Sequence, residues 1–286
     1  VTVLVTGASG LLGAAVLAAP PSATGAVGWS SADVDVRDGD AVRRAFGDLG
    51  PSCCVHCAAI ASATRCEDDP ALAWAVNAQG TAHVARACAE HGTRLVHIST
   101  DWVFDGTRPD GVGEDAPTAP LQVYGRTKLA AEGLALRVPG ALVVRVPLLY
   151  GAGSGHRPTW PQEVAERLTR GERCSADARE VRYPTLAGDV ARTLVALVER
   201  GASGVVHVAP REGITKHAWA LLLARRLGLD ESLVEPGAPV AGGPPRPRHA
   251  RLLTPVLDRL AIPPPHGVRE ALGRVAAALG EAAVRT

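Results

Sequence analysis

Short apolar runs alternate with longer amphipathic stretches along the first half of the chain. The first run, residues 1–6 (VTVLVT), is rich in β-branched residues and stops at a glycine, which is typical of a buried strand. Similar runs predict further strands at 25–29, 53–57, 94–99 and 141–146. Helical stretches lie between them, at 7–19, 40–48, 70–91 and 121–137. This alternation is typical of βαβ units, so we predict an α/β fold with a Rossmann-type, doubly wound parallel sheet that helices cover on both faces.

The pattern becomes less regular after Tyr150. It predicts helices near 160–171, 188–200, 214–228 and 267–283, one further strand at 204–209, and a Pro/Gly-rich loop at 236–248. We expect residues 1–150, with 185–209 returning to them, to form a nucleotide-binding domain. Residues 151–184 and 210–286 are expected to form a smaller C-terminal lobe that binds the substrate.

Charge and hydropathy narrow the choice of partners. Lysine and arginine total 30 against 29 acidic residues, so no net field attracts nucleic acid or an anionic membrane. No apolar run approaches the ~20 residues of a membrane span, and the apolar stretch 1–20 lacks the positive start of a signal peptide. We therefore expect a cytoplasmic protein that binds neither nucleic acid nor membrane.

The cysteines raise the question of a metal or redox site. Cys54 and Cys57 have CxxC spacing, but no second pair follows at the distance of a zinc site. With His56 they fall in the apolar run 53–57, where a reduced cysteine behaves as a small hydrophobic residue. We interpret these side chains as part of a buried strand and predict no metal site.

Three glycines stand at the turn between the first predicted strand and the first predicted helix. Gly7, Gly10 and Gly13 have the spacing G-x-x-G-x-x-G. Gly7 permits the tight turn, Gly10 lets a pyrophosphate approach the helix N-terminus, and Gly13 lets helix and strand pack closely. The position of this loop predicts a dinucleotide site; the alternative is a tight turn without a ligand.

The second predicted strand bears on the choice between NAD and NADP. An acid at its tip commonly binds the adenine ribose of NAD, but this strand ends "VGWSS" without one. The next acids, Asp33 and Asp35, are better placed to flank the adenine ring. The missing acid favours NADP(H) over NAD(H), although no arginine follows the strand immediately to hold a 2′-phosphate.

Tyr124 and Lys128 carry the clearest chemical signal. The chain contains two lysines and three tyrosines, and the spacing of four places this pair on one face of a predicted helix. A phenol titrates near pH ~10, but a neighbouring ammonium favours the phenolate and lowers that pKa. A compact ammonium can also bind ribose hydroxyls beside the phenol, whereas a planar guanidinium has a different shape. The alternative is a solvated pair on a helix surface.

A second polar feature precedes this helix. Ser99 and Thr100 end a predicted strand, at the edge of a parallel sheet where ligands usually bind. There the Thr100 hydroxyl can hydrogen-bond a carbonyl that Tyr124 protonates. The polar loop at 106–120 is long enough to cover such a substrate.

These segments together resemble the extended short-chain dehydrogenase/reductase family, and within it the dTDP-4-dehydrorhamnose reductase group. The matching pieces run in the expected order over nearly the whole chain. They are "VTGASGLLG", "VHCAA" (55–59), "VNAQGT" (76–81), "STDWVFDG" (99–106), "EDAPTAPLQVYGRTKLAAE" (114–132), "RVPLLYG" (145–151), "YPT" (183–185) and "RPRHARL" (246–252).

The resemblance implies an oxidoreductase with Thr100, Tyr124 and Lys128 as its catalytic triad. The cofactor contacts that we expect are Gly7, Ser9, Gly10, Leu11, Leu12, Asp35, Val36, Cys57, Ala58, Ala59, Ser99, Tyr124 and Lys128. The expected substrate contacts are Asp101, Trp102, Leu148, Arg182 and Arg248. The two arginines are candidates for a pyrophosphate or carboxylate because a guanidinium offers paired hydrogen bonds; a surface or salt-bridge role is the alternative for each.

Two functional hypotheses follow from the resemblance. The first is an NAD(P)H-dependent reductase of a nucleotide-linked 4-keto-6-deoxyhexose in deoxysugar biosynthesis within secondary metabolism, or of another small ketone of such a pathway. The second is a non-catalytic regulatory protein that binds NADP(H). Leu148 stands where such sugar reductases usually carry an aromatic residue, and several segments are similar to the regulatory β-subunit of methionine adenosyltransferase. A homodimer is kept open as the assembly.

Overall fold

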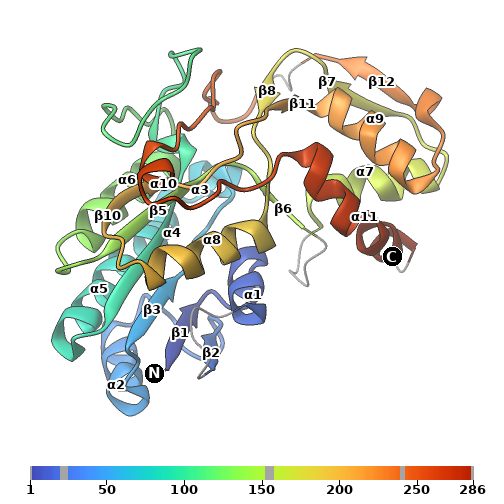
Figure 1. The fold of residues 1–286 in the computed structure, drawn as a ribbon. Helices are drawn as coiled ribbons and strands as arrows, with labels where there is room; N and C mark the ends of the chain where they lie inside the picture. The colour runs from blue at the N-terminus through green and yellow to red at the C-terminus, as the bar shows by residue number, and fades with distance from the viewer. Residues whose placement is uncertain (1, 20–24, 152–157, 239–241, 285–286) are drawn as a thin grey trace.

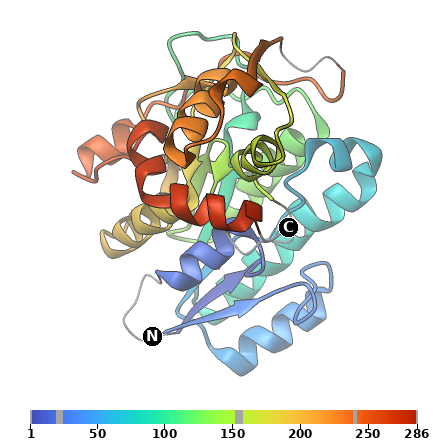
Figure 2. The same ribbon diagram turned by 90° about the vertical axis from the view of Figure 1, so that its right-hand side faces the viewer.

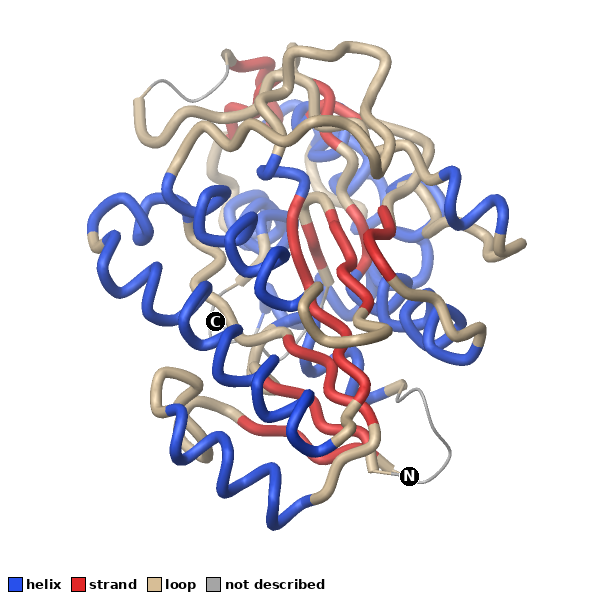
Figure 3. Tube along the Cα trace, turned by 90° about the vertical axis from the view of Figure 1, so that its left-hand side faces the viewer, coloured by secondary structure: helices blue, strands red, loops and turns tan. Residues whose placement is uncertain are grey.

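The central sheet contains six strands within the residues that this computed structural model describes, which are 2–19, 25–151, 158–238 and 242–284. Their order across the sheet is β10 (Gly204–His207), β5 (Leu142–Val146), β4 (Arg94–Thr100), β3 (Cys53–His56), β1 (Val3–Thr6) and β2 (Ala26–Trp29). All neighbouring strands pair in parallel (Figures 1 and 3). The predicted Rossmann-type sheet is confirmed. Residue 1 of the first predicted strand lies outside the described residues.

The order of the strands reverses between β1 and β3. The chain leaves β1 for β2 on one side of it and then crosses back to form β3 on the other side. In open α/β sheets ligands bind outside the carboxyl ends of the strands at such a point. Gly7 directly follows β1 and Cys57 directly follows β3, so the sheet brings the glycine loop and the "CAA" segment to this edge.

Helices cover both faces of the sheet because alternate residues of each strand point to opposite sides. Val3 and Val5 join a buried cluster with α1 (Leu11–Ala18) and α8 (Ala187–Glu199). Leu4 joins a second cluster with α2 (Gly39–Leu49), α5 (Gly80–His91) and α6 (Val123–Ala135). Full burial of one such aliphatic side chain stabilises the fold by about 1.5–3 kcal/mol. The strands therefore read as continuous apolar runs.

The helix predicted at 70–91 differs from expectation. It is observed as α4 (Pro70–Trp74), a π-helical turn η1 (Ala75–Gln79) and α5, and a further helix, α3 (Ala63–Asp68), precedes it. Within the π turn the Asn77 amide donates to the Ile60 carbonyl and to Thr127 Oγ1, and its oxygen accepts from the Ile60 amide. These bonds tie the turn to the "CAA" loop and to the helix that carries Tyr124, which a helical period alone does not reveal.

A third buried cluster lies in the second half of the chain. It packs α7 (Trp160–Thr169), α9 (Lys216–Leu227) and α11 (Val268–Val284) around Trp219 and Tyr150. Figure 1 groups these helices on the right, and Figure 2 shows α11 beside α7 and α9. The helices were predicted, but the parallel strand pair β7 (Cys174–Asp177) and β12 (Val234–Gly237) was not.

The remaining elements are short. They are η2 (Asp101–Val103), β6 (Leu149–Tyr150), β8 (Val181–Arg182), β9 (Thr185–Leu186), β11 (Ile214–Thr215), η3 (Glu231–Leu233) and α10 (Pro255–Arg259). The first two residues of the loop predicted at 236–248 belong to β12, and its residues 239–241 lie outside the described ranges. No helix in the described part of the chain has the length and apolar character that crossing a membrane requires.

Candidate active site

The glycine loop is held in its tight form by close backbone packing. Gly7 has φ +67°, and a Cβ added there would lie 2.6 Å from the Ala58 amide nitrogen. A Cβ at Gly13 would lie 2.2 Å from the Gly7 carbonyl oxygen. Helix α1 then begins after Gly10, and in the described structure no side chain caps its first turn. Its free N–H groups are available to an anion, so the loop fits a pyrophosphate.

One pocket of about 390 Å³ opens beside this loop at the end of β2. The predicted contacts Ser9, Asp35, Val36 and Ala58 line it. Ser30, Ser31, Arg37 and Arg65 line it as well, and sequence analysis missed them.

Arg37 lies in this pocket although it does not follow β2 directly. Its Nε donates to Asp35 Oδ2 at 2.9 Å, and this bond lowers the pKa of the Asp35 carboxyl. The signal that could have found Arg37 is its place two residues after Asp35 in "DVDVRD". The sequence shows no arginine directly after β2, but the fold brings the Arg37 guanidinium into the pocket at the end of this strand.

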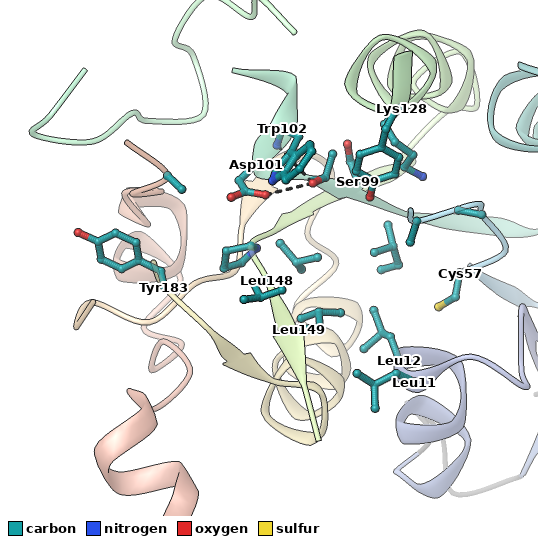
Figure 4. A pocket seen from close by; sticks show the side chains of 18 of the residues that line it. Leu11, Leu12, Cys57, Ser99, Asp101, Trp102, Lys128, Leu148, Leu149 and Tyr183 are labelled. Carbon is teal, nitrogen blue, oxygen red and sulfur yellow. Dashed lines mark hydrogen bonds between the residues drawn. The ribbon is translucent and has the colours of Figure 1, made fainter. Parts of the chain in front are cut away.

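A larger cavity of about 480 Å³ adjoins the first pocket and shares Gly7, Gly10, Cys57 and Ala59 with it. Figure 4 shows it from close by: Ser99, Asp101, Trp102 and Lys128 lie along one side, and Leu11, Leu12 and Cys57 along another. Leu148 and Leu149 lie between these sides and Tyr183. Leu148 is 41% exposed. The two pockets together give a continuous site across the glycine loop.

The residues of the predicted triad meet in this cavity. Thr100 is the last residue of β4, and Tyr124 and Lys128 stand one turn apart on α6. A Cβ at Gly125 would lie 2.3 Å from the Trp102 carbonyl oxygen, so the glycine after Tyr124 lets α6 approach η2 closely. The Trp102 and Tyr124 rings then meet edge to face, with centroids 5.9 Å apart.

Burial shifts the titration of the groups around the triad. It raises the pKa of Tyr124, so the lowering by Lys128 that was expected from the sequence is wrong for this state; hydrogen bonding with Thr100 acts against the rise. It lowers the pKa of Lys128 to about 8, against an opposing contribution from Glu132. Burial also raises the pKa of Asp101 to about 7, although Thr100 Oγ1 donates to Asp101 Oδ1 at 3.1 Å. Near neutral pH the site therefore holds a neutral phenol, an ammonium and a carboxyl whose pKa burial raises far above its usual value.

A buried ion pair supports the floor of the cavity. Arg145 Nη2 donates to Glu132 Oε2 at 2.7 Å and Arg145 Nε to Glu132 Oε1 at 2.9 Å, and both side chains are about 95% buried. Ser99 Oγ donates to the same carboxylate at 2.5 Å. Thus Ser99 lines the cavity, as expected, but its hydroxyl is occupied in tying β4 to α6.

Three cations line the far end of the cavity. They are Arg182, Lys216 and Arg246. Burial, Arg246 and Arg182 together lower the pKa of Lys216, whose Nζ lies 5.1 Å from the centroid of the Trp160 ring. Sequence analysis named Arg182 but missed Lys216 and Arg246; the rarity of lysine in the chain could have drawn attention to Lys216.

Arg248 lies elsewhere. It is exposed and falls outside the lining of both pockets, and its backbone carbonyl accepts a hydrogen bond from Arg182 Nη1. Every other predicted site residue lines one of the two pockets. Their roles as cofactor or substrate contacts remain predictions.

Comparison with known proteins adds independent information. The model of the RmlD substrate binding domain family matches residues 1–280. A dTDP-4-dehydrorhamnose reductase of Streptomyces griseus is 37% identical over 268 residues, which cover 87% of this chain and 84% of the relative. Methionine adenosyltransferase 2 subunit beta of Danio rerio is 34% identical over 278 residues, which cover 91% of this chain and 85% of the relative.

A solved structure gives the same picture. The crystal structure of a dTDP-4-dehydrorhamnose reductase from Bacillus anthracis in complex with NADP superposes with a TM-score of 0.88 at 25% identity. The superposition covers 96% of this chain and 96% of that chain.

Proposed function

Because the chain belongs to the RmlD substrate binding domain family, we propose that it is an NAD(P)H-dependent oxidoreductase that reduces the ketone of a nucleotide-linked 4-keto-6-deoxyhexose. The observation that carries the proposal is the meeting of Thr100, Tyr124 and Lys128 in a cavity continuous with the glycine loop. The fold, the glycine loop and the triad are each suited to the reduction of a ketone by NAD(P)H.

Each member of the triad has a distinct task. When bound, the cofactor supplies the hydride that reduces the carbonyl carbon. Tyr124 donates its phenolic proton to the carbonyl oxygen, and the Thr100 hydroxyl, which donates to Asp101 Oδ1 in this structure, turns to that oxygen and orients it. Lys128 stabilises the phenolate left on Tyr124 and binds the cofactor ribose. The apolar side of the cavity excludes water, which strengthens these electrostatic contacts.

The far end of the cavity suits the negatively charged diphosphate that links a sugar to its nucleoside. Three cations stand there, and guanidinium and ammonium groups bind diphosphate oxygens through charge-assisted hydrogen bonds. We assign Lys216 and Arg246 to the diphosphate of a nucleotide sugar, beside Arg182, whose guanidinium already pairs with Glu180 and donates to the Pro247 carbonyl. Relatives that are named for dTDP-linked sugars support this choice.

We propose NADP(H) as the preferred cofactor. Arg65 and Ser31 line the pocket at the end of β2 together with Arg37, which pairs with Asp35 and keeps Nη1 for a further acceptor, and these groups can bind a 2′-phosphate. The relative solved in complex with NADP supports the choice.

We also propose which segments bind the nucleotide cofactor and which bind the substrate. Residues 1–150 with 185–209 form the nucleotide domain, and 151–184 with 210–286 form the substrate lobe. Support comes from the cavity, whose cationic end is built by residues of the second group. A cytoplasmic location and a homodimer remain predictions.

A panel of substrates tests the proposal. Purified protein is mixed with NADPH or NADH and either dTDP-4-keto-6-deoxyhexoses or the same ketones without a nucleotide, and cofactor oxidation is followed by absorbance. We expect turnover with the nucleotide-linked ketones and a preference for NADPH. Equal turnover of ketones that lack the nucleotide would contradict the assignment of the cationic end.

A second function is favoured by one observation, the 34% identity with a methionine adenosyltransferase subunit over 91% of this chain. Under that alternative the protein binds NADP(H) as a regulatory subunit and reduces no ketone. Tight NADPH binding without oxidation by any ketone of the panel would favour it.

A further inference from the structure

Two buried histidines lie side by side beneath Lys128. His56 on β3 and His97 on β4 occupy paired positions in the sheet, and both are fully buried. Their ring centroids are 5.4 Å apart, with an interplanar angle of 35°. Nothing in the reaction assigned to the triad uses either ring.

The two rings have different partners. His56 Nδ1 lies 2.7 Å from Thr6 Oγ1 and its Nε2 lies 3.1 Å from Thr81 Oγ1, so hydroxyls from β1 and α5 hold both nitrogens. His97 Nε2 lies 3.2 Å from Lys128 Nζ. Its Nδ1 is buried and finds no hydrogen-bond partner among the described residues. Among the described residues, Lys128 is therefore the one hydrogen-bond partner of the His97 ring.

The chemistry of the pair sets the tautomer. A protonated lysine can only donate, so His97 Nε2 must accept and the ring proton must be on Nδ1. Burial and the nearby ammonium hold the pKa of His97 well below its usual value, so the ring stays neutral and does not relay protons. The neutral ring therefore presents the lone pair of its Nε2 to Lys128.

The other titratable groups that face Lys128 leave its charge in place. Burial lowers the pKa of His56 on β3 to about 3, and it raises the pKa of Cys57 to about 12, so both are neutral. Tyr124 on the same helix is neutral as well, because burial raises its pKa. Glu132, one turn along α6, is bonded to Arg145 and Ser99. Asp101, beyond the end of β4, hydrogen-bonds Thr100.

We propose that His97 is a positioning residue for the reaction: its neutral imidazole holds the Lys128 ammonium in place without cancelling the charge that acts on Tyr124 and the cofactor ribose. A carboxylate at this position would hold the lysine equally well but would neutralise it. The inference rests on the proposed role of Lys128.

The test compares His97 with His56 as its matched control. The Kd for NADPH is measured by fluorescence across pH 6 to 10 for the wild type and for H97N, H97Q, H56N and H56Q. An Asn side chain ends short of the Nε2 position and leaves the ammonium without its acceptor, whereas a Gln oxygen reaches that position. As the pH rises, Lys128 loses its proton and the affinity for NADPH falls. The pH at which the affinity falls therefore reports the pKa of Lys128.

We expect H97N to move this loss of affinity to lower pH by about one unit, and H97Q to restore it toward the wild-type position. H56N and H56Q, which alter the same buried layer, should leave it in place. Equal displacement by H97N and H56N, or no displacement by H97N, would overturn the inference. A wild type that binds neither NADPH nor NADH would instead overturn the proposed function, so the two failures are distinct.

Discussion

The two lysines of the chain define two regions that differ in how they use positive charge. Burial lowers the pKa of both. Lys128 is held by a neutral imidazole and stands one turn from Tyr124 on the same helix. Lys216 stands among Arg182 and Arg246 and over an aromatic ring. A single cation held by a neutral group keeps its charge for the cofactor and for a phenolate that forms beside it, whereas neighbouring cations disfavour one another's charge and together attract an anion.

Exchanging each lysine for arginine should separate the two regions most strongly. Lys128→Arg keeps the charge but places a planar, larger group in a site that is only 3% exposed, so we expect kcat to fall about 10²–10⁴-fold. Lys216→Arg keeps a cation in a partly open cluster and should leave kcat close to that of the wild type. Steady-state kinetics with a nucleotide-linked ketone measures both; equal losses would remove the distinction between the regions.

Replacing Lys128 should lower kcat but raise the free energy of unfolding at neutral pH. Its pKa is lowered from 10.5 to about 8, so below pH 8 the folded protein carries a buried charge at a cost of roughly 3 kcal/mol. Between pH 8 and 10.5 the unfolded chain binds this proton and the folded protein does not, so stability rises with pH in that window.

We therefore expect Lys128→Met to unfold at higher denaturant concentration than the wild type at pH 7, without cofactor. The difference should shrink toward pH 10. Chemical denaturation at several pH values measures this difference. A variant that is less stable at pH 7 would show that Lys128 is not penalised by its burial.

The smallest effect concerns two arginines of one segment. Arg246 lines the cationic end and Arg248 does not, so Arg246→Ala should raise KM for the nucleotide-linked substrate about 10-fold, the loss of one charge-assisted bond. Arg248→Ala should leave KM near the wild-type value. A larger rise in KM for Arg248→Ala than for Arg246→Ala would show that Arg248, not Arg246, binds the diphosphate.

The two regions also differ in how far sequence predicts them. The region of Lys128 is encoded locally: a glycine spacing at a strand end, a strand that ends in Ser99–Thr100, and a tyrosine four residues before a lysine. The sheet's order of strands then brings these pieces to one edge without further information. Such motifs can be recognised in the sequence because the residues of each are close together along the chain.

The region of Lys216 is assembled from segments distant in sequence. Arg182 is the last residue of β8, Lys216 begins α9 and Arg246 lies in an irregular stretch, so no spacing links them. The strand pair β7 and β12 and the π turn at Ala75–Gln79 were missed for a related reason. Short strands and a single widened turn depend on tertiary hydrogen bonds, such as those of Asn77, more than on local periodicity.

The proposed reduction depends above all on Tyr124, which donates the proton to the substrate ketone. Its most direct test follows NADPH oxidation with a dTDP-4-keto-6-deoxyhexose for the wild type and Tyr124→Phe, with the Kd for NADPH measured for both. We predict turnover by the wild type, a loss of about 10²–10⁴-fold in kcat for the variant, and similar cofactor affinity. Wild-type turnover that the phenylalanine variant retains would contradict it.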